Sequence, residues 1–385
     1  MHHNIRLLKI FNFLIGFSLF APLAIIYFSK VSGSYALGAS IFGITMLSSA
    51  IFEVPTGIWS DMVGRRGTII LGSWARVIAF ALYAIGLSYW WLVAGAIFEG
   101  LSRSFYSGNN DAFLHDTLAD EGESEDYHLY LGKITASEHL GVAISALIGG
   151  FVAIYSFTSL VWLTLLAQIL LLIPSYMFKD IKKRNNSSSN IYLHLGEAIK
   201  LFLSNNKIRS LSLADAISYA TGEVSFQFRA TFFSSIWPLW AISALHTVAQ
   251  FAVTISYYFS ARIIKKVGFE KLLLIRSIMG KVSGLIAFGI PSIFSPLITI
   301  VSSFIFGAGQ VAKNTLMQRE FSDHQRSTMS SLNSLLSNTL YFFTSILLGF
   351  FADQTTPRIA LLTLTIIAMP MVYIYWHIFN KKDSK

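Results

Sequence analysis

The chain has 385 residues, of which 54% are hydrophobic and only 13% are charged, and its mean hydropathy is +0.58. A soluble domain carries about a quarter of its residues as charges, so this composition excludes a water-soluble fold. The net charge of +9 does not indicate nucleic-acid binding, because the basic residues form short clusters between apolar blocks rather than one patch.

The apolar residues form blocks of roughly 20, the length of helix that crosses about 30 Å of hydrocarbon. Polar or Pro/Gly/Ser-rich breaks between the blocks predict twelve transmembrane helices. Their approximate ranges are 8–29, 37–60, 67–88, 90–118, 127–154, 156–178, 207–233, 236–262, 271–291, 295–321, 326–352 and 358–379. The first block is longer than the apolar core of a signal peptide, so we expect it to be retained as a helix.

Lysine and arginine are distributed unevenly between the predicted loops. If both termini are cytoplasmic, the inner segments hold Arg6, Lys9, Arg65, Arg66, Lys179, Lys182, Lys183, Arg184, Arg262, Lys265, Lys266, Arg319, Arg326, Lys381, Lys382 and Lys385. The outer loops hold only Lys30 and Arg358. This bias predicts a multi-pass protein of the bacterial inner membrane with both termini in the cytoplasm.

One long polar connection, residues 179–206, interrupts the series of helices. We interpret it as a cytoplasmic linker between an N-terminal six-helix bundle, 1–178, and a C-terminal six-helix bundle, 207–385. The halves show weak self-similarity, because the basic loop at Arg65 recurs at Lys265. Repeated halves joined by a long linker are typical of alternating-access transporters.

The loop between the second and third predicted helices contains the most specific motif in the chain. It reads Gly57-Ile58-Trp59-Ser60-Asp61-Met62-Val63-Gly64-Arg65-Arg66. Gly57 allows close approach of a neighbouring helix, and Gly64 permits a tight turn. Asp61 lies four residues before Arg65, a spacing that allows a charge pair. This G-x-x-x-D-x-x-G-R-R pattern resembles the signature loop of the major facilitator superfamily.

The resemblance implies an all-α polytopic membrane protein with twelve helices in two six-helix bundles. It also implies that Asp61 and Arg65 gate the outward-facing state, with Asp116 as a third member. The alternative is that Arg65 and Arg66 only anchor the loop in the cytoplasm. In the second half, Lys265 stands where the aspartate would fall, so only the first half carries the complete latch.

Two further segments resemble members of this superfamily. The stretches 52–57 and 107–116 look like those of bacterial drug-efflux and metabolite-efflux relatives. The fifth predicted helix carries Gly132, Gly141, Gly149 and Gly150 in register with the superfamily's antiporter motif, but Ser145-Ala146 replaces its central Gly-Pro. Small residues at this spacing predict close helix packing, and ordinary packing without an antiporter role is the alternative.

Ionisable residues inside a membrane are costly unless they face protein or a wet cavity, so each is a functional candidate. Glu53 lies about 12 Å along the second helix from Asp61, where a desolvated carboxyl suits reversible proton binding. A static hydrogen bond is the alternative. In the fourth helix, Glu99, Arg103 and Asn110 fall on one polar stripe. Glu99 and Arg103 could separate when solute or a proton arrives, or form a purely structural pair.

Other candidates occur in later helices. Glu138 and His139 are adjacent in the fifth helix and could relay a proton, although such a dyad is more often a packed polar contact. In the seventh helix Glu223 is deeper than Asp215, which we place near the inner end. The tenth helix, equivalent to the fourth, carries the polar residues Gln310, Lys313 and Asn314.

No metal-ligand spacing and no phosphate-binding loop occurs in the sequence, and cysteine is absent. We therefore expect no metal, no cofactor and no enzymatic activity, with an ion or solute gradient as the energy source. The leading hypothesis is a monomeric, proton-coupled exporter of a small, partly hydrophobic solute. The alternatives are a proton-coupled importer of a nutrient or organic anion, and a transporter-like sensor that binds ligand without turnover.

Overall fold

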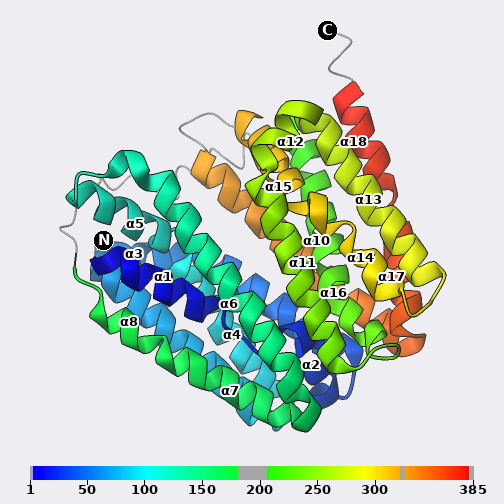
Figure 1. The fold of residues 1–385 in the computed structure, drawn as a ribbon, viewed down its shortest axis with the longest axis horizontal. Coiled ribbons are helices and arrows are strands. Elements are labelled where there is room, and N and C mark those ends of the chain that lie inside the picture. Colours follow the sequence, from blue (N-terminus) through cyan, green and yellow to red (C-terminus); the bar gives the residue numbers. More distant parts are fainter. Residues whose placement is uncertain (1–2, 181–205, 321–325, 381–385) are drawn as a thin grey trace. The chain divides into compact units, whose positions relative to one another are not determined.

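The computed structural model describes residues 3–180, 206–320 and 326–380 (Figure 1). Helices make up its regular structure, and no strand occurs in these ranges. The first half contains α1 (His3–Gly16), η1 (Ala21–Leu23), α2 (Ala24–Ser32), α3 (Tyr35–Ile85), α4 (Tyr89–Tyr106), α5 (Asn109–Asp120), η2 (Ser124–Asp126), α6 (Tyr127–Tyr155), α7 (Phe157–Leu170) and α8 (Leu172–Met177). The second half contains α10 (Asn206–Phe233), α11 (Leu239–Tyr258), α12 (Ser260–Val267), α13 (Phe269–Gly289), α14 (Ser295–Ile300), α15 (Ser303–Glu320), α16 (Arg326–Gln354), α17 (Pro357–Ile367) and α18 (Pro370–Asn380).

Ten helical segments of the described chain are long and apolar enough to cross a membrane. They coincide with ten of the twelve predicted helices. The other two predicted helices are also helical in the structure: 90–118 forms α4 and α5, and 207–233 lies in α10. Neither meets the same criterion of length and hydropathy. The all-α polytopic architecture expected from the sequence is therefore confirmed. Most of the predicted linker, from 181 to 205, lies outside the described residues.

The chain divides into two compact units. The first comprises Met1–Gly33, Ile44–Asn186 and Pro238–Thr247, and the second comprises Ser34–Gly43, Ser187–Trp237 and Val248–Lys385. Two short segments thus join the unit opposite to their half of the sequence. Local contacts explain this, because Thr247 Oγ1 donates a hydrogen bond to the Ala143 carbonyl in the first unit. In the second unit, Asp353 binds the start of α3.

The first predicted helix, 8–29, is not continuous, because α1 ends at Gly16 and α2 begins at Ala24. Side chains from elsewhere in the first unit satisfy the backbone groups that this break leaves unpaired. Thr164 Oγ1 accepts from the Leu19 N–H at 3.1 Å, and Gln168 donates to the Phe17 carbonyl at 3.0 Å. Arg76 donates to the Ile15 carbonyl at 2.7 Å. A broken helix is tolerated at membrane depth only with such partners.

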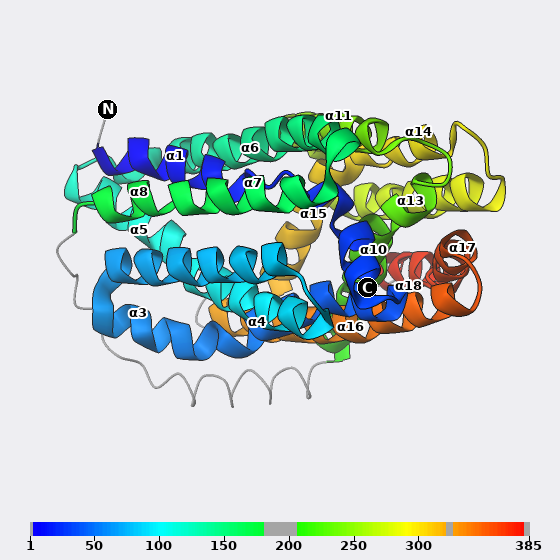
Figure 2. The same ribbon diagram turned by 90° about the horizontal axis from the view of Figure 1, so that it is seen from below.

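The second and third predicted helices are the two arms of α3, joined by a turn at Gly64 (Figure 2). Gly64 has φ 80° and ψ 167°, a conformation that favours glycine, so the predicted tight turn is confirmed. Gly268, the corresponding glycine in the second half, precedes α13 with φ 87° and ψ 157°. The weak repeat in the sequence therefore corresponds to a repeated backbone turn.

The fourth predicted helix, 90–118, is also broken. α4 ends at Tyr106 and α5 begins at Asn109, with Gly108 between them at φ 69°. The expected polar stripe through Glu99, Arg103 and Asn110 is therefore not continuous. The left-handed backbone at Gly108 interrupts the stripe, and ideal helical spacing takes no account of such a break.

The glycines of α6 allow this helix to contact α1 and the break that follows it closely. A Cβ atom added at Gly141 would overlap the Phe13 carbonyl oxygen, and one added at Gly149 would overlap the Leu19 carbonyl oxygen. At Gly132, nothing among the described residues lies within 4 Å of such an atom. The close packing predicted for this motif is confirmed at Gly141 and Gly149 but not at Gly132.

Gly141→Ala should lower the free energy of unfolding by about 1–3 kcal/mol, because α1 must shift to admit the methyl group. The matched variant Gly132→Ala should be neutral or stabilising, because alanine is favoured over glycine in a helix by about 1 kcal/mol. Thermal unfolding of the two purified variants in detergent measures the difference. Equal melting temperatures would contradict the packing role of Gly141.

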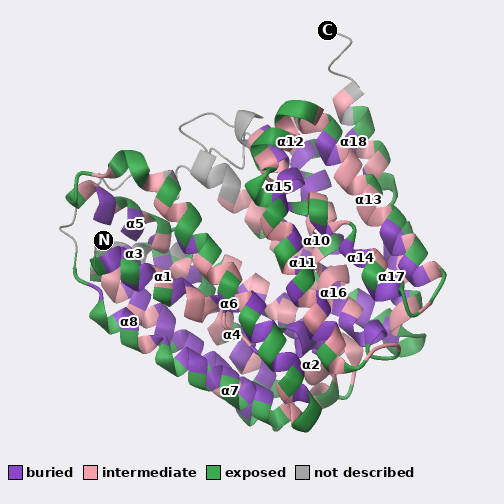
Figure 3. Ribbon diagram, in the orientation of Figure 1, coloured by how far each residue is buried: buried purple, intermediate pink, exposed green. Residues whose placement is uncertain are grey.

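The helices expose large apolar side chains on their outer surfaces. Figure 3 shows buried and exposed residues alternating along α7, whose exposed members are Trp162, Leu163, Leu166, Ile169 and Leu170. In water such a face would aggregate, but in a bilayer it contacts lipid tails. This distribution agrees with a membrane as the surrounding solvent.

Candidate functional site

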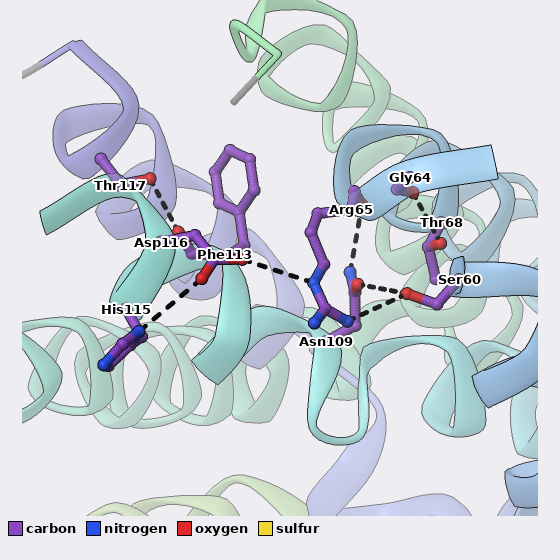
Figure 4. Close-up of polar contacts among 9 residues, drawn as sticks. All are labelled: Ser60, Gly64, Arg65, Thr68, Asn109, Phe113, His115, Asp116 and Thr117. Carbon is purple, nitrogen blue, oxygen red and sulfur yellow. Dashed lines mark hydrogen bonds and ion pairs between the residues drawn. The ribbon is translucent and has the colours of Figure 1, made fainter. Parts of the chain in front are cut away.

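A polar network joins the turn of α3 to the first turns of α5 (Figure 4). Arg65 donates to Ser60 Oγ at 3.2 Å, and its Nε lies 3.6 Å from Asp116 Oδ2. Ser60 in turn donates to Asn109 Oδ1 at 2.9 Å, and Asn109 Nδ2 donates to the Arg65 carbonyl at 3.1 Å. Asn109 therefore binds both sides of the turn, and Arg65 connects it to Asp116.

Other members of the signature loop are placed differently. Arg66 forms a 3.4 Å ion pair with Asp180 and donates to the Tyr176 carbonyl at 2.9 Å. No described atom lies within 4 Å of a Cβ added at Gly57, so the expected close helix approach there is wrong. The side chain of Asp61, the predicted partner of Arg65, lies outside the described residues.

A cavity of about 300 Å³ lies in the first unit beside the break between α4 and α5. Its wall comes from α1, from the α4–α5 break and from α6. The lining includes Asn12, Tyr106, Asn110, Asp111, Leu114 and Glu138. A volume of this size is at the lower end of the range for small-molecule sites.

Glu138 and Asn110, two of the predicted site residues, meet at this cavity. Within residues 3–180, 206–320 and 326–380, the Glu138 carboxylate has no hydrogen bond or ion pair. Asn110 Oδ1 is buried and also has no partner in that part of the chain. His139 is not among the lining residues and forms no ion pair with Glu138 in the described structure. Their predicted relay stays a prediction.

Glu99 and Arg103 form the ion pair that their spacing predicts. Arg103 Nη2 lies 2.8 Å from Glu99 Oε1, and the Tyr83 hydroxyl donates to Glu99 Oε2 at 2.9 Å. The Glu99 side chain is 14% exposed, whereas that of Arg103 is 45% exposed. The carboxylate is thus held between a buried tyrosine and a more accessible arginine, an arrangement that would respond to protonation.

The second unit contains a buried charge pair between α10 and α15. Lys313 Nζ lies 2.9 Å from Asp215 Oδ1, and Asn333 of α16 donates to Asp215 Oδ2 at 3.0 Å. One helical turn before Lys313, Gln310 accepts from Arg276 of α13 at 3.0 Å and contacts Asn314 at 3.4 Å. The three predicted residues of α15 therefore belong to two adjoining polar clusters.

The two carboxylates of α10 differ in burial. From the sequence we expect Glu223 to lie deeper in the membrane than Asp215, and that position along the membrane stays a prediction. Asp215 is 4% exposed and ion-paired, whereas Glu223 is half-buried and accepts from Gln227 at 3.0 Å. Glu53 is half-buried within α3, eleven residues before the turn at Gly64.

Four residues of these networks were not singled out as site residues from the sequence: Ser60, Asn109, Asn333 and Asp353. Ser60 lies in the signature loop, and Asn109 lies in the stretch 107–116 that resembles efflux relatives. Membership of these two motifs was the available signal. Asp353 accepts from Ser34 Oγ at 2.6 Å, from the Tyr35 N–H at 2.7 Å and from the Ala36 N–H at 3.0 Å. This carboxylate caps the N-terminus of α3 from more than 300 residues away, which no local pattern predicts.

Apolar membrane-length helices, a repeated glycine turn and a cavity with an unpaired carboxylate characterise a polytopic α-helical membrane protein. A family model described as Major Facilitator Superfamily matches residues 7–344. The chain therefore belongs to this superfamily of transporters.

Relatives in sequence carry transporter names. A transporter of Buchnera aphidicola is 27% identical over 195 residues, covering 50% of this chain and 48% of its own length. Thus this chain spans about half of that relative. An MFS-type transporter of Methanocaldococcus jannaschii is 22% identical over 357 residues, covering 89% of each chain. The class B tetracycline resistance protein of Escherichia coli is 25% identical over 159 residues, covering 40% of this chain and 38% of its own.

Solved structures with the same fold are more distant in sequence. A crystal structure of the nucleoside transporter NupG, D323A mutant, has a TM-score of 0.85 at 14% identity and covers 98% of this chain and 100% of its own. A POT family transporter in complex with 5-aminolevulinic acid has a TM-score of 0.76 at 14% identity, with 99% and 96% covered. At these identities the similarity establishes the fold alone.

Proposed function

We propose that this protein is a proton-coupled exporter that moves a small, partly hydrophobic solute by alternating access. It would lie in the cytoplasmic membrane as a monomer, with both termini in the cytoplasm. The distribution of lysine and arginine between the predicted loops supports this orientation.

The observation that carries the proposal is the shared first turn of α5. Asn109 belongs to the network that holds the α3 turn, while the next two residues, Asn110 and Asp111, line the cavity. A change in the Arg65–Asp116 contact would therefore be transmitted to the cavity wall over a single helical turn. Coupling between a gate and a ligand cavity is what alternating access requires.

Two findings support export and proton coupling. The matched relatives from Escherichia coli are named for resistance to tetracycline, and a transporter confers resistance to a drug by moving it outward. Glu99 and Glu138 are carboxylates in helices of the first unit, and Glu99 has hydrogen-bond partners that protonation would disturb. Intramembrane carboxylates of this kind are typical proton carriers.

An organic-anion importer is less well supported by the geometry. It would use Arg103 and Lys313 to bind the solute. However, Arg103 lies beside Glu99 and Lys313 beside Asp215, so each positive charge already has a carboxylate partner.

Proteoliposomes containing a pH-sensitive dye test the proposal. When a panel of drugs and metabolites is added, we expect at least one compound to drive protons in the antiport direction. Glu53→Gln or Glu99→Gln should abolish this movement, because glutamine has similar shape but cannot carry a proton. Glu125→Gln, at an exposed carboxylate of η2, is the matched control and should retain it.

Other outcomes would assign a different function. Proton movement in the same direction as the solute would indicate an importer. Binding without any proton movement would indicate another coupling ion or a non-transporting sensor, and would refute proton-coupled export.

A further inference from the structure

We infer that the cavity of the first unit binds a small organic cation, such as a quaternary or protonated amine, with Glu138 as its principal counter-charge. The inference rests on the proposed function, because it names the chemical class of the solute. It depends on the charge of the lining, on its unpaired acceptors and on its aromatic wall.

The cavity wall carries acidic side chains but no basic ones among the described residues. Glu138 and Asp111 contribute the carboxylates, from α6 and α5. The nearby guanidinium groups have other partners. Arg76 binds Gln168 and the Ile15 carbonyl, and Arg103 binds Glu99. A cation entering the cavity would therefore find a carboxylate without a bonded counter-charge.

Polar oxygens are available beside these carboxylates. Asn110 Oδ1 is buried and unpaired in the described structure, which is costly unless a ligand or water satisfies it. Asn12 is 8% exposed and uses its Nδ2 to donate to the Leu8 carbonyl, so the acceptor of its amide is not consumed by that bond. Oxygens of this type accept hydrogen bonds from the N–H groups of a protonated amine, and their partial negative charge also attracts a quaternary ammonium, which has no N–H to donate.

The remaining wall is aromatic and apolar. Tyr106 lines the cavity, and its hydroxyl is anchored by a 3.1 Å hydrogen bond to Ser73. The face of a tyrosine ring attracts organic cations. Leucine and isoleucine side chains complete the lining and suit the apolar part of the ligand.

The break between α4 and α5 also affects the ligand. The N-terminus of α5 presents partial positive charge, which would oppose a cation. Asp111 lies in the first turn of this helix and offsets that charge. We therefore expect the ligand's cationic group to lie nearer Glu138 than the helix terminus.

The test measures binding of phenyltrimethylammonium to the full-length protein in lipid nanodiscs by calorimetry, with empty nanodiscs as the blank. tert-Butylbenzene, its neutral isostere, and benzoate, an aromatic anion, are the matched ligands. Glu138→Gln should weaken cation binding by about tenfold or more, since it removes one charge at short range from a half-buried carboxyl group. Asp111→Asn should weaken it less, and Glu125→Gln should bind like the unmodified protein.

The inference is overturned if the protein does not bind the cation. It is also overturned if tert-butylbenzene binds equally well, or if Glu138→Gln leaves the affinity unchanged while the variant elutes as a folded monodisperse protein. A failure of this inference can be distinguished from a failure of the proposed exporter function. Charge-dependent binding without solute-driven proton antiport would preserve the cation site and reject the exporter, whereas antiport of a neutral solute insensitive to Glu138→Gln would do the reverse.

Discussion

Replacing Lys313 with methionine is expected to lower the free energy of unfolding by about 3–5 kcal/mol, the usual cost of removing one partner of a buried ion pair. The side chains of Lys313 and Asp215 are 15% and 5% exposed, and their charged atoms lie 2.9 Å apart. Without the ammonium, the Asp215 carboxylate would keep a single hydrogen bond, from Asn333. Methionine fills nearly the same volume, so the loss would reflect charge rather than packing.

Denaturant and thermal unfolding of the purified protein in detergent measure this effect. Lys271→Met removes an exposed lysine of α13 in the same unit and should change stability by no more than about 0.5 kcal/mol. Adding Asp215→Asn to Lys313→Met should recover much of the loss, because it removes the unpaired charge. If Lys313→Met and Lys271→Met are equally stable, the pair does not hold α10 to α15.

Arg65→Gln is expected to reduce transport by about tenfold or more while leaving the protein folded, which corresponds to about 1.4 kcal/mol or more at the limiting step. The Arg65 and Asp116 side chains are 33% and 30% exposed, so their ion pair adds only about 0–1 kcal/mol to stability. Its importance is positional, because Arg65 links Ser60 to Asp116 across the α3 turn. Arg65→Lys should also fail, since an ammonium cannot reproduce the planar fork of the guanidinium.

The neighbouring arginine provides the control. Arg66→Gln removes the same charge from the same loop, but its partner Asp180 is 77% exposed and lies outside the network of Figure 4. Solute uptake into proteoliposomes should therefore remain close to that of the unmodified protein. Equal loss of transport in both variants would favour the alternative that this loop acts only as a positively charged anchor.

Much of the fold could be predicted from the sequence because hydropathy is additive along a helix. All twelve predicted ranges are helical, and the glycine at position 64 forms the turn expected between the second and third helices. The breaks at 17–20 and at Gly108 were missed. A break inside an apolar block leaves the average hydropathy unchanged, and it is stabilised by side chains such as Thr164 and Gln168 that lie far away in the chain.

The candidate site likewise has some residues that the sequence predicts and some that only the packed structure identifies. The signature motif identified Arg65 and Asp116, and periodicity identified the pair of Glu99 and Arg103, because both depend on local spacing or on a shared pattern. The burial of Asp215 beside Lys313 and the cap supplied by Asp353 depend on helices that meet only after folding.

The sequence by itself determined that this chain is a membrane-spanning helical protein with a repeated, signature-bearing architecture, since composition, block length and motif spacing are properties of the unfolded chain. Only the tertiary structure decided which charges are paired, where the helices break and that Glu138, Asp111 and Asn110 line one cavity. Those features depend on desolvation and on partners from different helices, and neither exists until the helices pack.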